Sequence, residues 1–222
     1  MQAENDNNKV LIADEGGIAR IVFAMRSYPN NANVQEYGCA SLVNLSYNND
    51  ANKVKIAKEG GINTILCAMK TQLSNAYVQE NGCALLWKLS ENDDNQVKIS
   101  DKGGIAKIMT VMNEHLDNSD VQEYGCAALW NLAENDNNKG MIALKGGITT
   151  ILSAMKTHLP NADVQEFGCG ALGNLALNDK NKGMIADADG QAIIMSALGN
   201  HASHSGVQDN GNTALFTLTI GN

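Results

Sequence analysis

The sequence has little proline, a shortage of basic residues and no long apolar run. Only 2 of 222 residues are proline, which leaves most of the chain able to form helices, because proline disrupts helix interiors. The 16 Lys and Arg are outnumbered by 24 Asp and Glu, for a formal net charge of -8. No basic cluster offsets this charge, so nucleic acids and anionic membrane surfaces are poor partners. No uncharged apolar stretch reaches the roughly 18 residues that a membrane span requires.

Targeting and catalytic signals are also missing. The first residues, MQAENDNNKV, lack the basic start and apolar run of a secretory signal, so we expect a cytoplasmic or nuclear protein. No nucleophile, base and orienting group stand together apart from the repeat pattern described next. We therefore expect neither an enzyme nor a cofactor. The 44% apolar content is sufficient for a substantial core.

An internal repeat is the most informative feature that is present. The pair Val-Gln recurs in steps of 43 or 44 residues, at Val34, Val78, Val121, Val164 and Val207. A glycine pair precedes it by 18 residues each time, starting at Gly16, Gly60, Gly103 and Gly146, and Asp189-Gly190 takes the fifth place. The extra residue of the first step falls between repeats 1 and 2, around Asn48 to Asn52, where a loop can tolerate it.

Each repeat predicts three helices. An Asn-rich stretch such as 135–138 supplies an N-cap for a short first helix, and the first glycine of the pair ends it in the left-handed conformation. Asp189 is a tolerable substitute at that place. The second helix carries apolar residues at Ile148, Ile151 and Met155. The third helix opens with Asp163-Val-Gln-Glu166, which we interpret as a capping box.

The stretch VQEYGCAALWNLAENDNNKGMIALKGGITTILSAM resembles an armadillo repeat, most closely those of leucine-rich repeat kinases and of protist and algal armadillo proteins. The resemblance covers essentially the whole chain. It implies an all-α fold, a right-handed α-solenoid of five armadillo-type three-helix repeats in a single domain, 1–222. The repeats span about 5–48, 49–91, 92–134, 135–177 and 178–222. Neighbours must stack, since one such unit cannot bury its apolar faces alone.

The resemblance also implies a function. Third helices of armadillo proteins line a concave groove that holds an extended peptide, so we expect a non-catalytic protein-interaction scaffold. The acidic charge favours basic segments as partners. The ends of the array are candidates for self-association. The alternative is a structural or regulatory fragment of a larger protein, or a designed or consensus array, with no free-peptide ligand.

Candidate groove residues follow from the family pattern and from the helical period. The asparagine that bonds the peptide backbone in this family corresponds to Asn44, Asn131 and Asn174, with Lys88 and Thr217 replacing it in repeats 2 and 5. The tryptophan four residues earlier, present in nuclear import adaptors, is absent, so we do not expect recognition of a nuclear localisation signal. The residue seven before the asparagine lies about 20° away on the helix. This row consists of Tyr37, Asn81, Tyr124, Phe167 and Asn210.

Further positions are weaker candidates. The residue four after the ladder position adds an amide row of Asn48, Asn92, Asn135 and Asn178, of which we retain Asn92 and Asn135 as second-tier site residues. Trp87 and Trp130 lie on the flank of the groove. We interpret them first as packing between repeats and retain them as second-tier candidates too.

The remaining repeated residues have structural interpretations. Cysteines in one slot of successive repeats lie too far apart for disulfides, so we expect buried thiols at Cys39, Cys83, Cys126 and Cys169, with Cys67 as a fifth. The histidines His115, His158 and His201 suit a helix C-terminus. No carboxylate or cysteine at ligand spacing completes a metal site around His201 and His204, so no metal is expected. Capping explains the row of Glu36, Glu80, Glu123 and Glu166 better than an acidic binding track.

Overall fold

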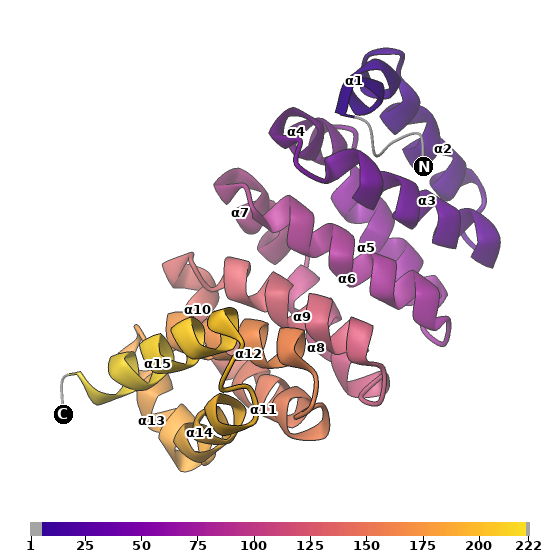
Figure 1. Ribbon diagram of the computed structural model, residues 1–222. Coiled ribbons are helices and arrows are strands. Elements are labelled where there is room, and N and C mark those ends of the chain that lie inside the picture. The colour runs from indigo at the N-terminus through magenta and orange to yellow at the C-terminus, as the bar shows by residue number, and fades with distance from the viewer. Residues whose placement is uncertain (1–5, 221–222) are drawn as a thin grey trace. The chain divides into compact units, whose positions relative to one another are not determined.

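The computed structural model describes residues 6–220, and within that range every regular element is an α-helix (Figure 1). Short, medium and long helices follow one another in that order in each of five repeats. The short helices are α1 (Asp6–Asp14), α4 (Asp50–Lys58), α7 (Asp93–Asp101), α10 (Asp136–Leu144) and α13 (Asp179–Asp187). The second helices are α2 (Gly17–Ser27), α5 (Gly61–Thr71), α8 (Gly104–Glu114), α11 (Gly147–Thr157) and α14 (Gly190–Asn200). The third helices are α3 (Ala32–Ser46), α6 (Ala76–Ser90), α9 (Ser119–Leu132), α12 (Ala162–Leu175) and α15 (Ser205–Thr219).

The chain divides into two compact units, Met1–Lys107 and Ile108–Asn222, with the boundary inside α8. In the first unit α3 packs along α6, and in the second α12 packs against both α9 and α15. Repeats thus stack through their third helices within each unit, which confirms the all-α repeat fold. The single domain 1–222 stays a prediction. In the part of the chain that is described, no helix combines the length and apolarity needed to cross a membrane.

The predicted ends of the short helices are confirmed. Asn135 is the N-cap of α10, and its side chain accepts hydrogen bonds from the backbone N–H groups of Asn137 and Asn138. The first glycine of each pair has φ between +78° and +87°, and Asp189 adopts the same left-handed region at φ +58°. Asn48 also has a positive φ, +52°, in the loop where the extra residue was expected.

The capping box predicted for the third helices is wrong. Asn161 is the N-cap of α12 and accepts from the Val164 N–H at 3.0 Å, so Asp163 lies inside the helix. In a capping box the glutamate is the third residue after the N-cap. That position is Val164, whereas Glu166 is the fifth residue after Asn161. The same cap is provided at the other third helices by Asn31, Asn75, Asn118 and His204.

The recurring glutamine of Val-Gln joins the second helix to the third. Gln165 is fully buried, and its side-chain Nε2 donates to the carbonyls of Met155 at 3.0 Å and His158 at 2.9 Å. Those carbonyls belong to the end of α11, where the helix itself leaves acceptors unpaired. The same pair of bonds is made by Gln35, Gln79, Gln122 and Gln208. The Val-Gln signature is therefore structural.

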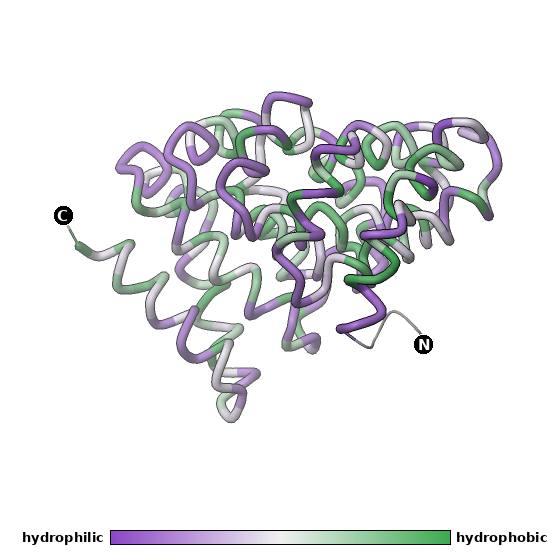
Figure 2. The backbone as a smooth tube through the Cα atoms, turned by 90° about the horizontal axis from the view of Figure 1, so that it is seen from above, coloured by the Kyte–Doolittle hydropathy of each residue, from purple (hydrophilic) through white to green (hydrophobic). Residues whose placement is uncertain are grey.

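The core forms from the apolar stripes of the helices, which alternate with hydrophilic stretches along the chain (Figure 2). Ile148, Ile151 and Met155 are buried as the period predicts. The cysteines of the third helices are buried too. Cys67 is exposed, so the prediction of a fifth buried thiol is wrong. It lies in α5 between the buried Ile65 and Ala68, on the outward side of that helix.

Candidate functional site

The row seven residues before the ladder position lies on the third helices, and its members differ in exposure. Tyr37 on α3 is 67% exposed, whereas Tyr124 on α9 and Phe167 on α12 are half-buried. Asn81 on α6 donates from its amide to the Tyr77 carbonyl at 2.8 Å, one turn earlier in its own helix. Asn210 on α15 donates to the Glu166 carbonyl of the preceding repeat at 3.3 Å. Aromatic and amide groups therefore share one position of the repeat.

Trp130 and Phe167 form an aromatic pair across two repeats of the second unit. Their ring centroids lie 6.0 Å apart with an interplanar angle of 40°. The indole occupies the space left by Gly170, where an added Cβ would lie 2.7 Å from the ring. This agrees with the interpretation of Trp130 as packing between repeats. The indole remains half-buried rather than fully enclosed, so part of its surface stays accessible.

One ladder asparagine, Asn174, also takes part in repeat stacking. Asn174 donates from Nδ2 to the Trp130 carbonyl at 3.1 Å, which joins α12 to α9. Asn131 is half-buried and Asn44 is exposed. The bond of Asn174 uses one of its amide hydrogens, and an amide has a second hydrogen and an oxygen that can accept. In repeat 4 the ladder position thus makes a contact between repeats and keeps further hydrogen-bonding capacity in its amide.

Lys88, which replaces the asparagine in repeat 2, is drawn into a local cluster of the first unit. It is 8% exposed, and its Nζ pairs with Glu91 Oε1 at 3.0 Å. The same ammonium lies 3.4 Å from the centroid of the Trp87 ring and 5.2 Å from that of Tyr47. Lys53 pairs with the other oxygen of Glu91. Charge and hydrogen bonds of Lys88 are therefore largely satisfied within the protein.

The second-tier asparagines are helix caps. Asn92 accepts from the Asn95 N–H at 3.1 Å, and Asn135 caps α10 in the same way. Their oxygens are thereby committed to the backbone, and their NH₂ groups are what they can offer to a ligand. At the start of repeat 2 the cap of α4 is Asn49, which accepts from the Asn52 N–H at 3.0 Å. Asn48 has the spacing of the amide row but is not a helix cap, because Asn49 holds that position.

The glutamates of the third helices do not cap them, contrary to the prediction, because asparagine holds that position. Glu36, Glu80, Glu123 and Glu166 lie half-buried within the first half of their helices. The Glu166 carboxylate packs closely on the backbone of Gly206 in the next repeat. An acidic row therefore lies one residue before the aromatic and amide row on the same helices.

Carboxylates do approach His204, which the sequence did not indicate. Ligand atoms of Asp163, Glu166 and His204 lie within 4.8 Å of one another. Glu166 Oε2 is 3.7 Å from His204 Nδ1, the atom that also accepts from the Val207 N–H at 3.4 Å. The two acids come from the preceding repeat. They are about 40 positions from His204 in the sequence, because residues in contact across a repeat junction are about one repeat period apart. A search for ligands close to the histidine in sequence could not find them.

The histidines after the second helices act between repeats. His158 Nε2 lies 2.7 Å from the Leu116 carbonyl, and His201 Nε2 lies 2.7 Å from that of Leu159. A carbonyl only accepts, so Nε2 carries the hydrogen in both rings. An inter-repeat hydrogen bond therefore adds to the helix-terminus role expected from the sequence. The recurrence of histidine at this position in three repeats is the sequence feature that could have indicated this bond.

A second polar contact between repeats comes from the Asn-rich stretches. Asn181 is buried and donates from Nδ2 to the Leu175 carbonyl at 3.1 Å and to the Lys139 carbonyl at 3.3 Å. Asn52 makes the equivalent bonds to Leu45 and Lys9 in the first unit. In these two stretches one asparagine caps the short helix and another joins it to neighbouring helices, whereas the equivalent Nδ2 of Asn138 is buried without a hydrogen-bond partner.

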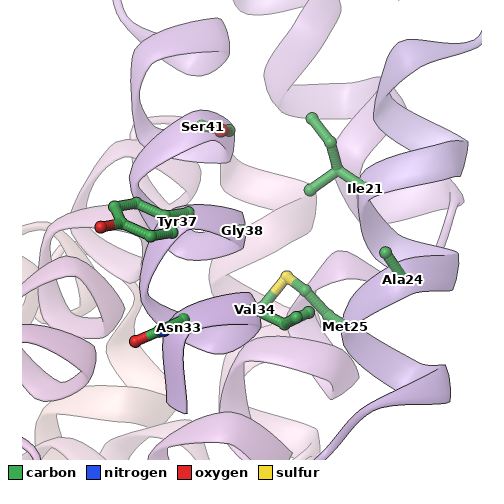
Figure 3. A pocket seen from close by; sticks show the side chains of 8 residues that line it. All are labelled: Ile21, Ala24, Met25, Asn33, Val34, Tyr37, Gly38 and Ser41. Carbon is green, nitrogen blue, oxygen red and sulfur yellow. The ribbon is translucent and has the colours of Figure 1, made fainter. Parts of the chain in front are cut away.

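An apolar hollow lies beside Tyr37 in the first unit. It has a volume of about 320 Å³ and is enclosed by α2 on one side and α3 on the other (Figure 3). Its lining is Ile21, Ala24, Met25, Asn33, Val34, Tyr37, Gly38 and Ser41. The hollow offers almost no polar group, so it suits an apolar side chain.

Proteins of known structure share this fold. No family model matches the sequence, and no curated protein does. Two engineered proteins of known structure superpose with TM-scores of 0.84 and 0.85 at 22% and 21% identity. They cover 98% and 99% of this chain and 85% and 88% of their own. A structure from work on a phosphorylation switch that controls the interaction between cadherin and beta-catenin gives 0.82 at 17% identity, covering 96% of this chain and 39% of that one.

Proposed function

We propose that this protein is a non-catalytic, armadillo-like interaction scaffold that binds an extended peptide or partner segment along its third helices. The observation that carries the proposal is the accessible Trp130–Phe167 pair, which spans two repeats beside Asn174. Aromatic rings supply large, rigid contact areas of the kind that dominate binding energy. Neighbouring side-chain amides can donate to and accept from the backbone of a bound extended peptide, whose N–H and C=O groups have no partner in a sheet.

Each unit has its own set of proposed site residues. In the second unit the set comprises Tyr124, Trp130, Asn131, Phe167 and Asn174. In the first unit the set comprises Tyr37, Asn44, Asn81 and Lys88, with Trp87 beside them. Because Lys88 is engaged with Glu91 and two aromatic rings, we expect the second unit to contribute more of the binding energy. Asn92 and Asn135 contribute only through their NH₂ groups.

A basic segment is the partner class that we propose. The net charge is -8, and an acidic row of the third helices stands one residue before the aromatic and amide row. Acidic surfaces raise the association rate of basic partners more than they raise intrinsic affinity, and salt weakens the effect. Binding should therefore be salt-sensitive.

The test uses two sets of fluorescently labelled peptides of about a dozen residues, long enough to cross several repeats at roughly 3.3 Å per residue. One set is rich in Lys and Arg, and the other replaces these with Glu and Asp. We expect anisotropy titrations to show binding of the basic set. Tyr124→Ala and Asn131→Ala should each weaken it by up to about tenfold, equivalent to about 1.4 kcal/mol.

The matched control is Phe23→Ala on α2, because Phe23 is 71% exposed and lies outside the third helices. It should leave both binding and the melting curve unchanged. A chain that binds neither peptide set would contradict the proposal and favour a structural role within a larger assembly. A complex whose peptide avoids the third helices would also overturn it.

Self-association is a second interaction that we propose. Large apolar side chains of the first and last repeats, Tyr37 and Phe216 among them, are exposed to solvent. The equivalents of these residues in other repeats, Tyr124 and Trp130 among them, are half-buried. Exposed apolar surface of this kind favours contact with another protein surface. A rise of solution mass with protein concentration is the expected result.

A further inference from the structure

The third helix of repeat 5 begins differently from the other third helices. In repeats 1 to 4 an asparagine is the N-cap, and its side-chain oxygen accepts from the backbone at 3.0–3.2 Å. The N-cap of α15 is His204, and its bond to the Val207 N–H is longer, at 3.4 Å. Histidine is not among the residues favoured at an N-cap. Capping alone therefore does not account for an imidazole at this position.

A second difference lies two residues further along the same helix. Gly206 stands where repeats 1 to 4 carry Asn33, Tyr77, Asp120 and Asp163. The Glu166 carboxylate of the preceding repeat fills the space, since an added Cβ on Gly206 would overlap with its Oε2 atom. The glycine thus allows a carboxylate of repeat 4 to reach the first turn of α15, beside the imidazole.

The two differences bring three metal-binding groups together across one repeat junction. Ligand atoms of Asp163, Glu166 and His204 lie within 4.8 Å of one another, and α12 packs against α15 within the second unit. Asp163 and Glu166 are three residues apart on α12, so they share one face of that helix. Bonds of about 2.0–2.1 Å in a tetrahedral zinc site separate the ligand atoms by roughly 3.3 Å. Because Asp163 is exposed, its side chain can rotate to make this small adjustment.

The cluster consists of acceptor groups. The Val207 N–H donates to His204 Nδ1, so in the neutral ring this nitrogen carries a lone pair and Nε2 carries the hydrogen. Nδ1 lies 3.7 Å from Glu166 Oε2, and the Glu166 side chain is 25% exposed. Neutral imidazole and ionised carboxylate are the forms that bind metal ions. Metal binding would replace the bond from Val207, which at 3.4 Å is longer than a typical hydrogen bond, so the exchange costs little.

We propose that Asp163, Glu166 and His204 bind one zinc ion, which joins repeat 4 to repeat 5. An imidazole combined with carboxylates suits zinc, whereas Mg²⁺ and Ca²⁺ favour sites made of oxygen ligands alone. Three protein ligands leave a fourth position for water. This site revises the expectation from the sequence that no metal is bound. It goes beyond the proposed interaction function, and the proposed peptide contacts do not include these three residues.

Calorimetric titration of the metal-free chain with Zn²⁺ tests the site. All titrations use a Cys67→Ser background, because the exposed thiol of Cys67 can bind zinc itself. We expect uptake of one Zn²⁺ per chain at micromolar concentrations, and a midpoint of thermal unfolding that rises with zinc concentration. An excess of Mg²⁺ should not displace the zinc.

Two substitutions remove a ligand while preserving the shape of the junction. His204→Asn restores the cap that the other third helices have, and Glu166→Gln keeps the length of the side chain. Each should weaken zinc affinity by at least about tenfold, because even groups that only orient a metal ligand cost roughly 10–100-fold when they are removed. His204→Asn should also abolish the rise of the unfolding midpoint with zinc. Circular dichroism checks that both variants are folded.

Asp120→Asn is the matched control. Asp120 has the place of Asp163 one repeat earlier, but Asn161 stands at that junction where the next has His204. The substitution should leave the affinity and stoichiometry of zinc unchanged. A chain that takes up no Zn²⁺ at micromolar concentrations would overturn the proposal, as would undiminished binding by His204→Asn or an equal loss in Asp120→Asn. Because the readout is zinc itself, this failure is distinguishable from a failure of peptide binding.

Discussion

A buried glutamine joins the second helix of each repeat to the third. Gln165 bonds two carbonyls at the end of α11 while lying on α12. Removing one partner of a buried hydrogen bond leaves the other partners desolvated, which costs more than the bond itself contributes. The recurrence of Val-Gln is explained by this double bond.

Gln165→Leu tests that explanation. The substitution preserves most of the volume and leaves the Met155 and His158 carbonyls without their donor. We expect a loss of about 1–3 kcal/mol in the free energy of unfolding, measured by urea denaturation. Gln191→Leu, at an exposed position of α14, is the control and should change stability by no more than about 0.5 kcal/mol. Equal effects at the two positions would refute a special role for Gln165.

The thiols provide a second prediction. Burial raises the pKa of Cys39, Cys83 and Cys169 to about 12. Thiolate is the reactive form, so these groups should be inert near neutral pH. In the native protein we expect one fast-reacting thiol, Cys67, toward a disulfide reagent, and five in urea. Loss of the fast phase in Cys67→Ser would assign it, and a second fast thiol would contradict the burial described above.

A third prediction concerns acid. The Lys139 side chain, through its hydrogen bond and charge, lowers the pKa of Asp136 below its ordinary 3.8. A lowered carboxyl pKa contributes stability above the ordinary value, and that contribution is lost as the pH falls through the folded-state pKa. Asp136→Asn should therefore reduce stability at about pH 7 and matter less at about pH 3.

Asp93 supplies the comparison for that experiment. It has the same place at the start of α7, but Gln96 stands where α10 has Lys139. Asp93→Asn should show a weaker pH dependence in the same denaturation series. A pH dependence as large as that of Asp136→Asn would exclude the lysine as its cause.

At the scale of helices, glycine determines how closely the second and third helices of a repeat approach. An added Cβ on Gly168 of α12 would lie 2.6 Å from Met155 Cγ on α11, and the same pairing recurs at Gly38, Gly82 and Gly125. Gly183 of α13 faces open space. One residue type therefore has opposite consequences in two helices of the same unit.

Alanine substitution should separate these consequences. Gly168→Ala overpacks the contact with Met155 and should destabilise by about 1–3 kcal/mol. Gly183→Ala improves helix propensity without a clash and should stabilise by about 1 kcal/mol. Thermal and urea unfolding of both variants measure the difference. Stabilisation by Gly168→Ala would mean that the Met155 side chain can shift to make room at little cost.

Much of the helical organisation could be predicted from the sequence, because it depends on local chemistry. The glycine pairs, Asp189 and the cap at Asn135 each act within one turn of the chain. The start of the third helix could not be settled in this way, since Asn161 and Asp163 are both competent caps and only the helix geometry selects between them. Cys67 was misassigned because its neighbours Ile65 and Ala68 are buried while its own side of α5 is not.

For the whole molecule, the contacts between repeats were the part that sequence reasoning could not supply. Asp163, Glu166 and His204 converge only because repeat 5 stacks on repeat 4. The Trp130–Phe167 pair and the bond from Asn174 to the Trp130 carbonyl depend on the same kind of stacking. The aromatic and ladder rows could be placed on the third helices from their period, but their partners lie a full repeat away.

The histidine bonds between repeats bear on how far one repeat can slide along the next. His158 and His201 donate from Nε2 to the carbonyls of Leu116 and Leu159, which belong to the preceding repeat. A hydrogen bond weakens steeply when its length or direction changes, so each ring permits only a narrow range of positions between the two repeats. The rings therefore help to define the spacing of the repeats along the stack, a task that apolar contacts, which have no preferred direction, perform less strictly.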